Sequence, residues 1–263
     1  MLADFPCRRG CIALAVVFFA GCNAAPDQSA LHPAGPAAAE IAWLWWVMLS
    51  AFTAVFILVV ALMLAALLRR PTTDSSSRLG ALPPLGRTGF VVGGGLVLPI
   101  LVLTPLYLLS LKSSSVLRVP QGGLTIRVVG HQWWWEVRYP RQGIVTANEI
   151  HIPVGQPVRL ELTSADVIHS FWAPRLNGKR DLIPGIETEF WIQADEPGVY
   201  RGQCGEYCGT QHANMAFEVI ALPPAEFAAW LAERPQPRQR QPENEPRGLQ
   251  VFLRSGCSQC HAV

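Results

Sequence analysis

The sequence CGEYCGTQHANM, residues 204–215, places two thiols, an imidazole and a thioether on one short stretch. Cys208, His212 and Met215 have the spacing with which a strand end and the following loop present a thiolate, an imidazole and a weak axial thioether to a copper ion. Cys204 adds a second thiol, which a single copper held by one thiolate and two imidazoles does not need. Two copper ions can share two bridging thiolates, so the stretch favours a pair of copper ions.

Two other interpretations of this stretch stay open at this point. Each copper of a pair needs its own imidazole, and His169 is the candidate for the second one. A zinc ion bound by two Cys and two His would use the same groups but would leave Met215 unexplained. A disulfide between Cys204 and Cys208 is the other interpretation, for the copper-free protein in an oxidising compartment.

The composition predicts a chain with both a membrane part and a soluble part. Half of the 263 residues are hydrophobic and 15% are charged, which is too apolar for one soluble domain and too mixed for a pure membrane bundle. The net charge of +2 sums segments of opposite charge and therefore identifies no partner. The sequence contains no nucleic-acid-binding signature.

The N-terminal residues 1–22 have the pattern of an export signal. Two arginines precede an apolar stretch that ends at Phe19-Ala20-Gly21-Cys22, which predicts a lipoprotein-type signal peptide with Cys22 as the acylated first residue of the mature chain. An uncleaved signal anchor is the alternative. Residues 23–40, rich in Ala and Pro, are expected to form an exposed tether.

Two uncharged apolar stretches, residues 41–68 and 90–111, are each long enough to cross a bilayer as a helix. The loop between them, residues 69–89, contains four arginines and one acid, so the positive-inside rule places it in the cytoplasm. Both ends of this multi-pass chain then face outward. The expected location is the bacterial inner membrane, with the C-terminal domain on the periplasmic side.

Residues 120–232 show the period of two that is typical of half-buried β-strands. Leu124, Ile126 and Val128 alternate with Thr125, Arg127 and Val129, and further short runs are separated by Pro and Gly turns. This pattern predicts a small Greek-key β-barrel, closed by one helix at residues 224–233. The expected fold class is therefore a membrane-anchored all-β protein, a two-helix transmembrane hairpin followed by a barrel.

The C-terminal part contains a haem-attachment pattern. Residues 233–247, rich in Pro and Gln, predict a linker. Cys257, Cys260 and His261 form C-x-x-C-H, in which two thiols bind haem c covalently and the histidine ligates its iron. Since no second iron ligand follows, we expect residues 248–263 to be a short, poorly packed helix at the incomplete start of a cytochrome c domain.

The copper stretch, together with Val167-Ile168-His169-Ser170, resembles the binuclear CuA site of cytochrome c oxidase subunit II, and the resemblance covers about residues 40–232. It implies a cupredoxin-like barrel that binds two copper ions. By this resemblance the ligands are the bridging thiolates of Cys204 and Cys208, the imidazoles of His169 and His212, the thioether of Met215 and the backbone carbonyl of Glu206.

The resemblance extends to one of three consecutive tryptophans. Gly130-His131-Gln132-Trp133, followed by two more aromatic residues, is similar to the family motif whose first tryptophan lies over the copper site and receives the electron from cytochrome c. This implies that Trp133 is the point of electron entry. For Trp134 and Trp135 we expect ordinary aromatic packing.

Two further features concern the boundary with subunit I. Residues 179–185 resemble the family segment that faces subunit I below the copper site. In the family, the side chain of the residue matching Glu206 helps to bind magnesium at this boundary, and a carboxylate oxygen suits that ion. The family usually has a glutamate at the start of the second membrane helix, whereas residues 87–90 contain no acid, so no proton-entry role is assigned.

The function that the resemblance implies is that of subunit II of a haem–copper cytochrome c oxidase with a C-terminal cytochrome c extension. Cytochrome c would reduce the copper pair, which would pass electrons to haem in subunit I for oxygen reduction coupled to proton pumping. The expected partners are subunit I, the other oxidase subunits, cytochrome c and the membrane. A nitric-oxide or nitrous-oxide reductase subunit and a copper-delivery protein are the alternatives, and a quinol oxidase subunit would lack the thiols and imidazoles.

Overall fold

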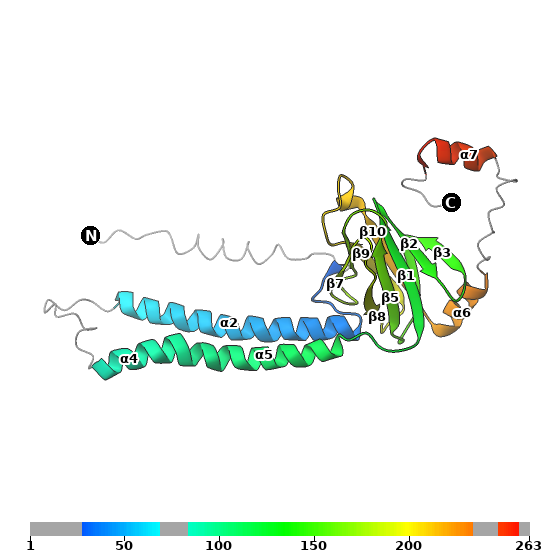
Figure 1. Cartoon of the computed structure of the whole chain (residues 1–263). Helices are drawn as coiled ribbons and strands as arrows, with labels where there is room; N and C mark the ends of the chain where they lie inside the picture. The colour runs from blue at the N-terminus through cyan, green and yellow to red at the C-terminus, as the bar shows by residue number, and fades with distance from the viewer. Residues whose placement is uncertain (1–27, 69–83, 234–246, 258–263) are drawn as a thin grey trace, which may run out of the picture.

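The computed structural model describes residues 28–68, 84–233 and 247–257 (Figure 1). The predicted signal peptide with Cys22, most of the arginine-rich loop and most of the C-terminal linker lie outside these ranges. Two of the three residues predicted to attach haem, Cys260 and His261, also lie outside them.

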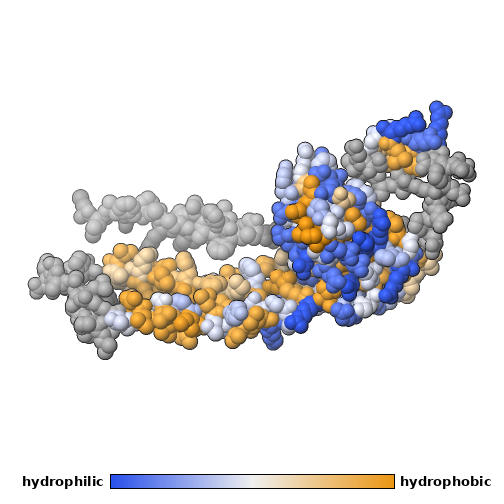
Figure 2. All heavy atoms as spheres, in the orientation of Figure 1, coloured by the Kyte–Doolittle hydropathy of each residue, from blue (hydrophilic) through white to orange (hydrophobic). Residues whose placement is uncertain are grey.

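Two long apolar helices lie side by side and lead into the β-domain (Figure 1). The first is α2, Pro36–Leu68. The second is continuous through α4 (Pro84–Val92), a π-helical turn (Gly93–Val97) and α5 (Leu98–Val116). Both are long and apolar enough to cross a membrane, and Figure 2 shows their surface as mostly hydrophobic beside a largely polar β-domain.

The π-helical turn coincides with three consecutive glycines. A Cβ added to Gly93, Gly94 or Gly95 would meet no atom within 4 Å outside the neighbouring backbone of its own helix. Without side chains to fix the backbone, glycine is the residue that most easily departs from regular α-helix geometry. The departure therefore has a local cause in the sequence.

The first helix begins at Pro36, whereas the sequence predicts its start at Ile41. Part of the predicted tether also packs against the β-domain. The Ala34 N–H donates a hydrogen bond of 2.7 Å to the carbonyl of Arg175, and a Cβ on Gly35 would lie only 2.0 Å from a backbone oxygen. Ala37 and Ala38 are buried. The prediction of an exposed tether is wrong for residues 34–38, because small side chains here permit close contact.

The β-domain consists of two five-stranded sheets that pack face to face. The first sheet has the order β3-β2-β1-β5-β8 and the second β4-β10-β9-β6-β7. The strands are β1 (Leu124–His131), β2 (Trp134–Tyr139), β3 (Ile144–Ala147), β4 (Glu149–Pro153), β5 (Val158–Ser164), β6 (His169–Trp172), β7 (Lys179–Leu182), β8 (Thr188–Ile192), β9 (Gly198–Cys204) and β10 (Ala216–Leu222).

Crossovers within each sheet give the domain its Greek-key character. β1 pairs antiparallel with β2 and parallel with β5, while β10 pairs antiparallel with β9 and parallel with β4. The expected fold class, two apolar helices followed by a cupredoxin-like barrel, is confirmed.

Alternating residues of the strands meet in one aromatic-rich core. Trp135 is fully buried, with its ring centroid 6.0 Å from that of Phe171 and 5.2 Å from that of Phe217. Burying side chains of this size provides the main stabilisation of the barrel. The predicted closing helix is α6, Pro224–Glu233, and its Trp230 stacks on His151 at 4.2 Å.

One long-range hydrogen bond joins the barrel to the second membrane helix, and another joins the two membrane helices to each other. The indole N–H of the buried Trp191 donates to the carbonyl of Leu117, at 3.1 Å, just beyond the end of α5. The Ser113 hydroxyl in α5 donates to the Glu40 carboxylate in α2 at 2.7 Å. The first of these bonds holds the β-domain against the end of α5.

The C-terminal α7, Arg247–Arg254, has no buried residue, as expected for a short, poorly packed helix. Cys257 follows it and is exposed.

Gly202 on β9 is a position where a methyl group has no room. A Cβ there would lie 2.1 Å from the ring of Phe217. We expect Gly202→Ala to lower the free energy of unfolding by about 1–3 kcal/mol, the usual effect of overpacking a core. Thermal unfolding of the full chain in detergent, followed by circular dichroism of the β-domain, measures this.

The matched control is Gly178→Ala. Its Cβ would meet Ile41 at an ordinary contact distance of 3.5 Å. We expect this variant to stay within about 0.5 kcal/mol of the wild type. Equal destabilisation of both variants would contradict the steric explanation for Gly202.

Candidate metal centre

The predicted ligands lie together at one end of the second sheet. His169 begins β6 and Cys204 ends β9, and these two strands are neighbours, with Phe171 paired to Cys204. The chain then runs through a loop and the short 3-10 turn His212–Asn214 to Met215, directly before β10. Strand pairing thus brings His169 to a loop more than thirty residues further along the chain.

The side chains divide into two halves around two thiols. The sulfur atoms of Cys204 and Cys208 lie 3.8 Å apart. Nδ1 of His169 is 3.9 Å from the Cys204 sulfur, and Nδ1 of His212 is 3.5 Å from the Cys208 sulfur. The Met215 sulfur is 3.7 Å from that of Cys208. Each thiol therefore has an imidazole nitrogen of its own.

A weak oxygen donor lies beside Cys204, in the position that the Met215 thioether has beside Cys208. The backbone carbonyl of Glu206 lies 3.1 Å from the Cys204 sulfur, while the Glu206 side chain is exposed. Each half of the site then offers one imidazole, one weak axial donor and a share in both thiols. This set fits two soft ions with shared thiolates better than one tetrahedral zinc, which has no use for Met215.

The two cysteines are free thiols in the structure. Their sulfur separation of 3.8 Å is well beyond the roughly 2.05 Å of a disulfide. The site is also dry: His169, Cys204, Cys208 and Met215 are buried, and His212 is half-buried. A dry site strengthens each electrostatic interaction within it.

The protein alone does not favour two thiolates side by side. Burial would raise the pKa of Cys204, but hydrogen bonds from His169 and from backbone groups outweigh it and lower the pKa to about 7. Burial and the adjacent Cys204 charge raise the pKa of Cys208 to about 12. Bound metal cations would offset the repulsion between the two thiolate charges. Metal binding is therefore expected to release the proton of the Cys208 thiol.

Asp166 contacts the candidate site, and the sequence analysis did not identify it. Its Oδ1 accepts a hydrogen bond of 2.8 Å from Nε2 of His169, which leaves Nδ1 facing the thiols. Burial alone would raise the pKa of Asp166, but hydrogen bonds from His169, Gln132 and Val167 hold it below its ordinary value. Metal-binding histidines usually have such an oriented partner. The only signal in the sequence is an acid three residues before His169.

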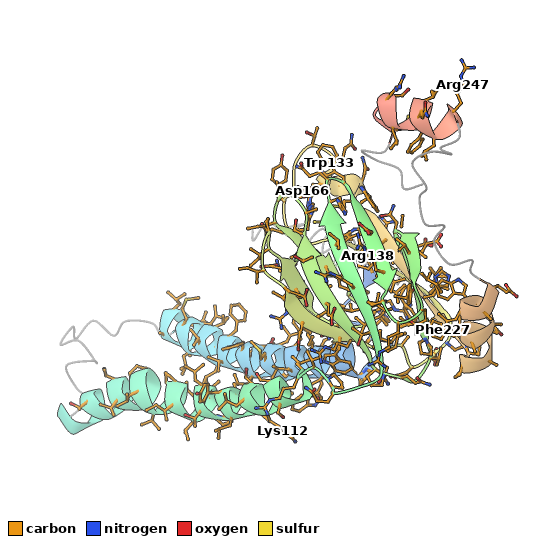
Figure 3. All side chains as sticks on the ribbon, turned by 45° about the vertical axis from the view of Figure 1, so that its right-hand side comes forward. Lys112, Trp133, Arg138, Asp166, Phe227 and Arg247 are labelled. Carbon is orange, nitrogen blue, oxygen red and sulfur yellow. The ribbon has the colours of Figure 1, made fainter. Side chains whose placement is uncertain are left out.

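The three consecutive tryptophans have different surroundings. Trp133 lies against the metal loop, with its indole N–H donating to the carbonyl of Cys208 at 3.2 Å. Trp134 stacks on His131 at 4.5 Å, and Trp135 is in the core. Figure 3 shows Trp133 at the end of the barrel where Asp166 also lies. Of the three indoles, Trp133 contacts the metal loop, whereas the ring centroid of the buried Trp135 lies 6.0 Å from that of His169.

These features define a cupredoxin-like protein with two apolar helices and a two-thiol candidate metal centre. The family model of the periplasmic domain of cytochrome c oxidase subunit II matches residues 141–222. Cytochrome c oxidase subunit 2 of Alkalihalophilus pseudofirmus is 33% identical over 264 residues, covering 94% of this chain and 74% of that protein. The chain belongs to the cytochrome c oxidase subunit II family.

Two further proteins are similar over shorter stretches. Cytochrome c oxidase subunit 2 of Bacillus sp. strain PS3 is 34% identical over 171 residues, which is 62% of this chain and 48% of that relative. The periplasmic domain of subunit II of cytochrome oxidase from Bradyrhizobium japonicum, a solved structure, is 36% identical, with a TM-score of 0.42, and the match covers 44% of this chain and 95% of that one.

Proposed function

We propose that this subunit II carries a binuclear copper centre that accepts electrons from cytochrome c and passes them to haem in subunit I. The observation that carries the proposal is the division of the donors into two halves, each with one imidazole and one weak donor, around sulfur atoms 3.8 Å apart. A pair of copper ions, when bound, supplies one-electron redox chemistry with little change in geometry.

The residues of this chain have separate roles in that function. Cys204 and Cys208 would bridge the ions, His169 and His212 would bind one ion each, and Met215 would be a weak axial ligand. Burial of these donors excludes water and holds their geometry constant, which favours rapid electron transfer over ligand exchange. The oxygen chemistry takes place in another subunit.

Trp133 is proposed as the point of electron entry from cytochrome c. Trp133 is half-buried, so part of the residue remains accessible to a partner while Nε1 contacts the carbonyl of Cys208. A rigid hydrogen bond to the loop fixes the distance between the indole and the centre. Asp166 holds the imidazole of His169 in the tautomer that presents Nδ1.

The proposal includes an assembly on the outer face of the inner membrane, with the chain crossing twice. Subunit I and the other oxidase subunits would contact α2, α5 and the base of the barrel. The exposed side chain of Glu206 is accessible to a magnesium ion shared with subunit I. Covalent haem c at Cys257, Cys260 and His261 is a further proposal, supported by the C-x-x-C-H spacing and by the exposure of Cys257.

The deciding experiment is metal analysis of the full chain purified in detergent and loaded with copper. The expected result is two copper ions per chain and the electron paramagnetic resonance signal of a mixed-valence pair. One copper or one zinc per chain would contradict the proposal. A pyridine haemochrome assay on chain matured in cells that attach haem c tests the haem proposal separately.

Met215 is expected to tune the centre rather than to hold it. In Met215→Leu the bridging thiolates and both imidazoles remain, so we expect two copper ions per chain and a changed reduction potential, because only the weak axial ligand is lost. Redox titration of the visible absorption measures this. Met63→Leu, in the membrane helix α2, is the matched control and should leave the potential unchanged; a loss of copper from Met215→Leu would contradict the axial role.

A further inference from the structure

The first sheet supplies none of the proposed ligands, yet one corner of it contacts both segments that carry them. His169 and the 204–215 stretch belong to the second sheet and its loops. The corner is Gly130–Trp133, at the end of β1 and the turn into β2. We call this the β1–β2 corner.

On one side, the corner holds the metal loop through a single carbonyl. The side-chain amide of Gln132 donates to the Cys208 carbonyl at 2.8 Å, and the Trp133 indole donates to the same oxygen at 3.2 Å. Gly209 has no side chain to interfere, since a Cβ there would lie 3.1 Å from the Gln132 amide nitrogen. In the part of the chain that the structure describes, these two bonds are the hydrogen bonds between residues 206–211 and the first sheet.

On the other side, the corner holds the segment that carries His169. The backbone N–H of Gln132 donates to Oδ2 of Asp166 at 2.7 Å, and Oδ1 of Asp166 accepts from His169 at 2.8 Å. The imidazole packs directly on the backbone of Gly130, where a Cβ would be 2.8 Å from the ring. One residue, Gln132, is therefore bonded to both ligand segments.

We propose that Gln132 is a positioning residue that holds the two ligand segments in a fixed relative position before metal binds. We call these hydrogen-bonded segments the frame. Its side chain fixes the loop at Cys208, and its backbone N–H fixes Asp166 and, through it, the His169 ring. The expected effect on copper release rests on the proposed copper function. The hydrogen bonds that hold the two ligand segments together belong to the protein alone and do not depend on it. Outer contacts of this kind typically change metal affinity by about 10–100-fold when removed.

The side-chain bond is removed by Gln132→Met, which keeps the length and approximate shape of the side chain but has no donor. We expect two results with the full chain in detergent. Without metal, amide hydrogen exchange across residues 205–212 should accelerate by about tenfold or more, and copper loaded into the variant should pass to a chelator about 10–100-fold faster than from the wild type.

The matched control is Gln193→Met. The Gln193 amide donates to Asp195 at 2.9 Å on an exposed surface, so the same change removes a comparable hydrogen bond elsewhere in the domain. Gln132→Glu is a second variant, in which an acceptor replaces the donor that faces the Cys208 carbonyl. It should accelerate exchange and copper release at least as much as Gln132→Met.

The proposal is overturned if amide exchange and copper release in Gln132→Met stay within about twofold of the wild-type rates. It is also overturned if Gln193→Met changes both rates as much as Gln132→Met does. If Gln132→Met does not fold, the same limits apply to Gln132→Glu. The two proposals fail separately. If the wild type binds no copper pair while Gln132→Met still loosens residues 205–212, the frame stands and the copper function fails.

Discussion

The Cys208→Ser variant is expected to lose the copper pair altogether. The sulfur of Cys208 lies 3.8 Å from the Cys204 sulfur of the other half of the site and, within its own half, 3.5 Å from Nδ1 of His212 and 3.7 Å from the Met215 sulfur. A serine hydroxyl stays protonated and is a hard donor, so it cannot replace a bridging thiolate. Electron transfer from cytochrome c should fall by more than the roughly 100-fold typical of outer contacts.

Metal analysis and the mixed-valence resonance signal are the measurements for this variant. Cys257→Ser is the matched control, because Cys257 is an exposed thiol beyond α7 and outside the site. It should retain both copper ions. Retention of two copper ions by Cys208→Ser would show that Cys208 does not bridge them.

The second large effect is expected from Trp133→Phe. This change removes the hydrogen bond to the Cys208 carbonyl and the indole that lies against the loop, but it changes no charge. Reduction of the copper pair by cytochrome c should slow by at least about tenfold, equivalent to ~1.4 kcal/mol of barrier. Docking should change little. Stopped-flow reduction at several cytochrome c concentrations separates the rate constant from the affinity.

Trp134→Phe provides the matched control for the electron-entry prediction. Trp134 is adjacent in sequence and partly exposed, but its ring stacks on His131 rather than on the metal loop. We expect its reduction rate to equal that of the wild type. If Trp134→Phe slows reduction and Trp133→Phe does not, electrons enter through the other indole.

Much of this protein follows from local patterns in its sequence. The spacing of Cys204, Cys208, His212 and Met215 places these donors within twelve residues of one another in the sequence. The length of the apolar stretches determines that two helices can cross a bilayer. Alternating residues determine which faces of the strands are buried, because side chains in a strand point to opposite faces in turn.

The tertiary structure decided the features that join distant parts of the chain. Asp166 and Gln132 meet because β1 and the segment before β6 end at the same corner, and nothing local to either residue predicts that contact. The tertiary structure also decided which of three adjacent tryptophans contacts the metal loop. It likewise decided that residues 34–38 pack on the barrel instead of forming a tether. Sequence patterns determine which groups can bind a metal, whereas strand register and packing determine which residues hold those groups in place.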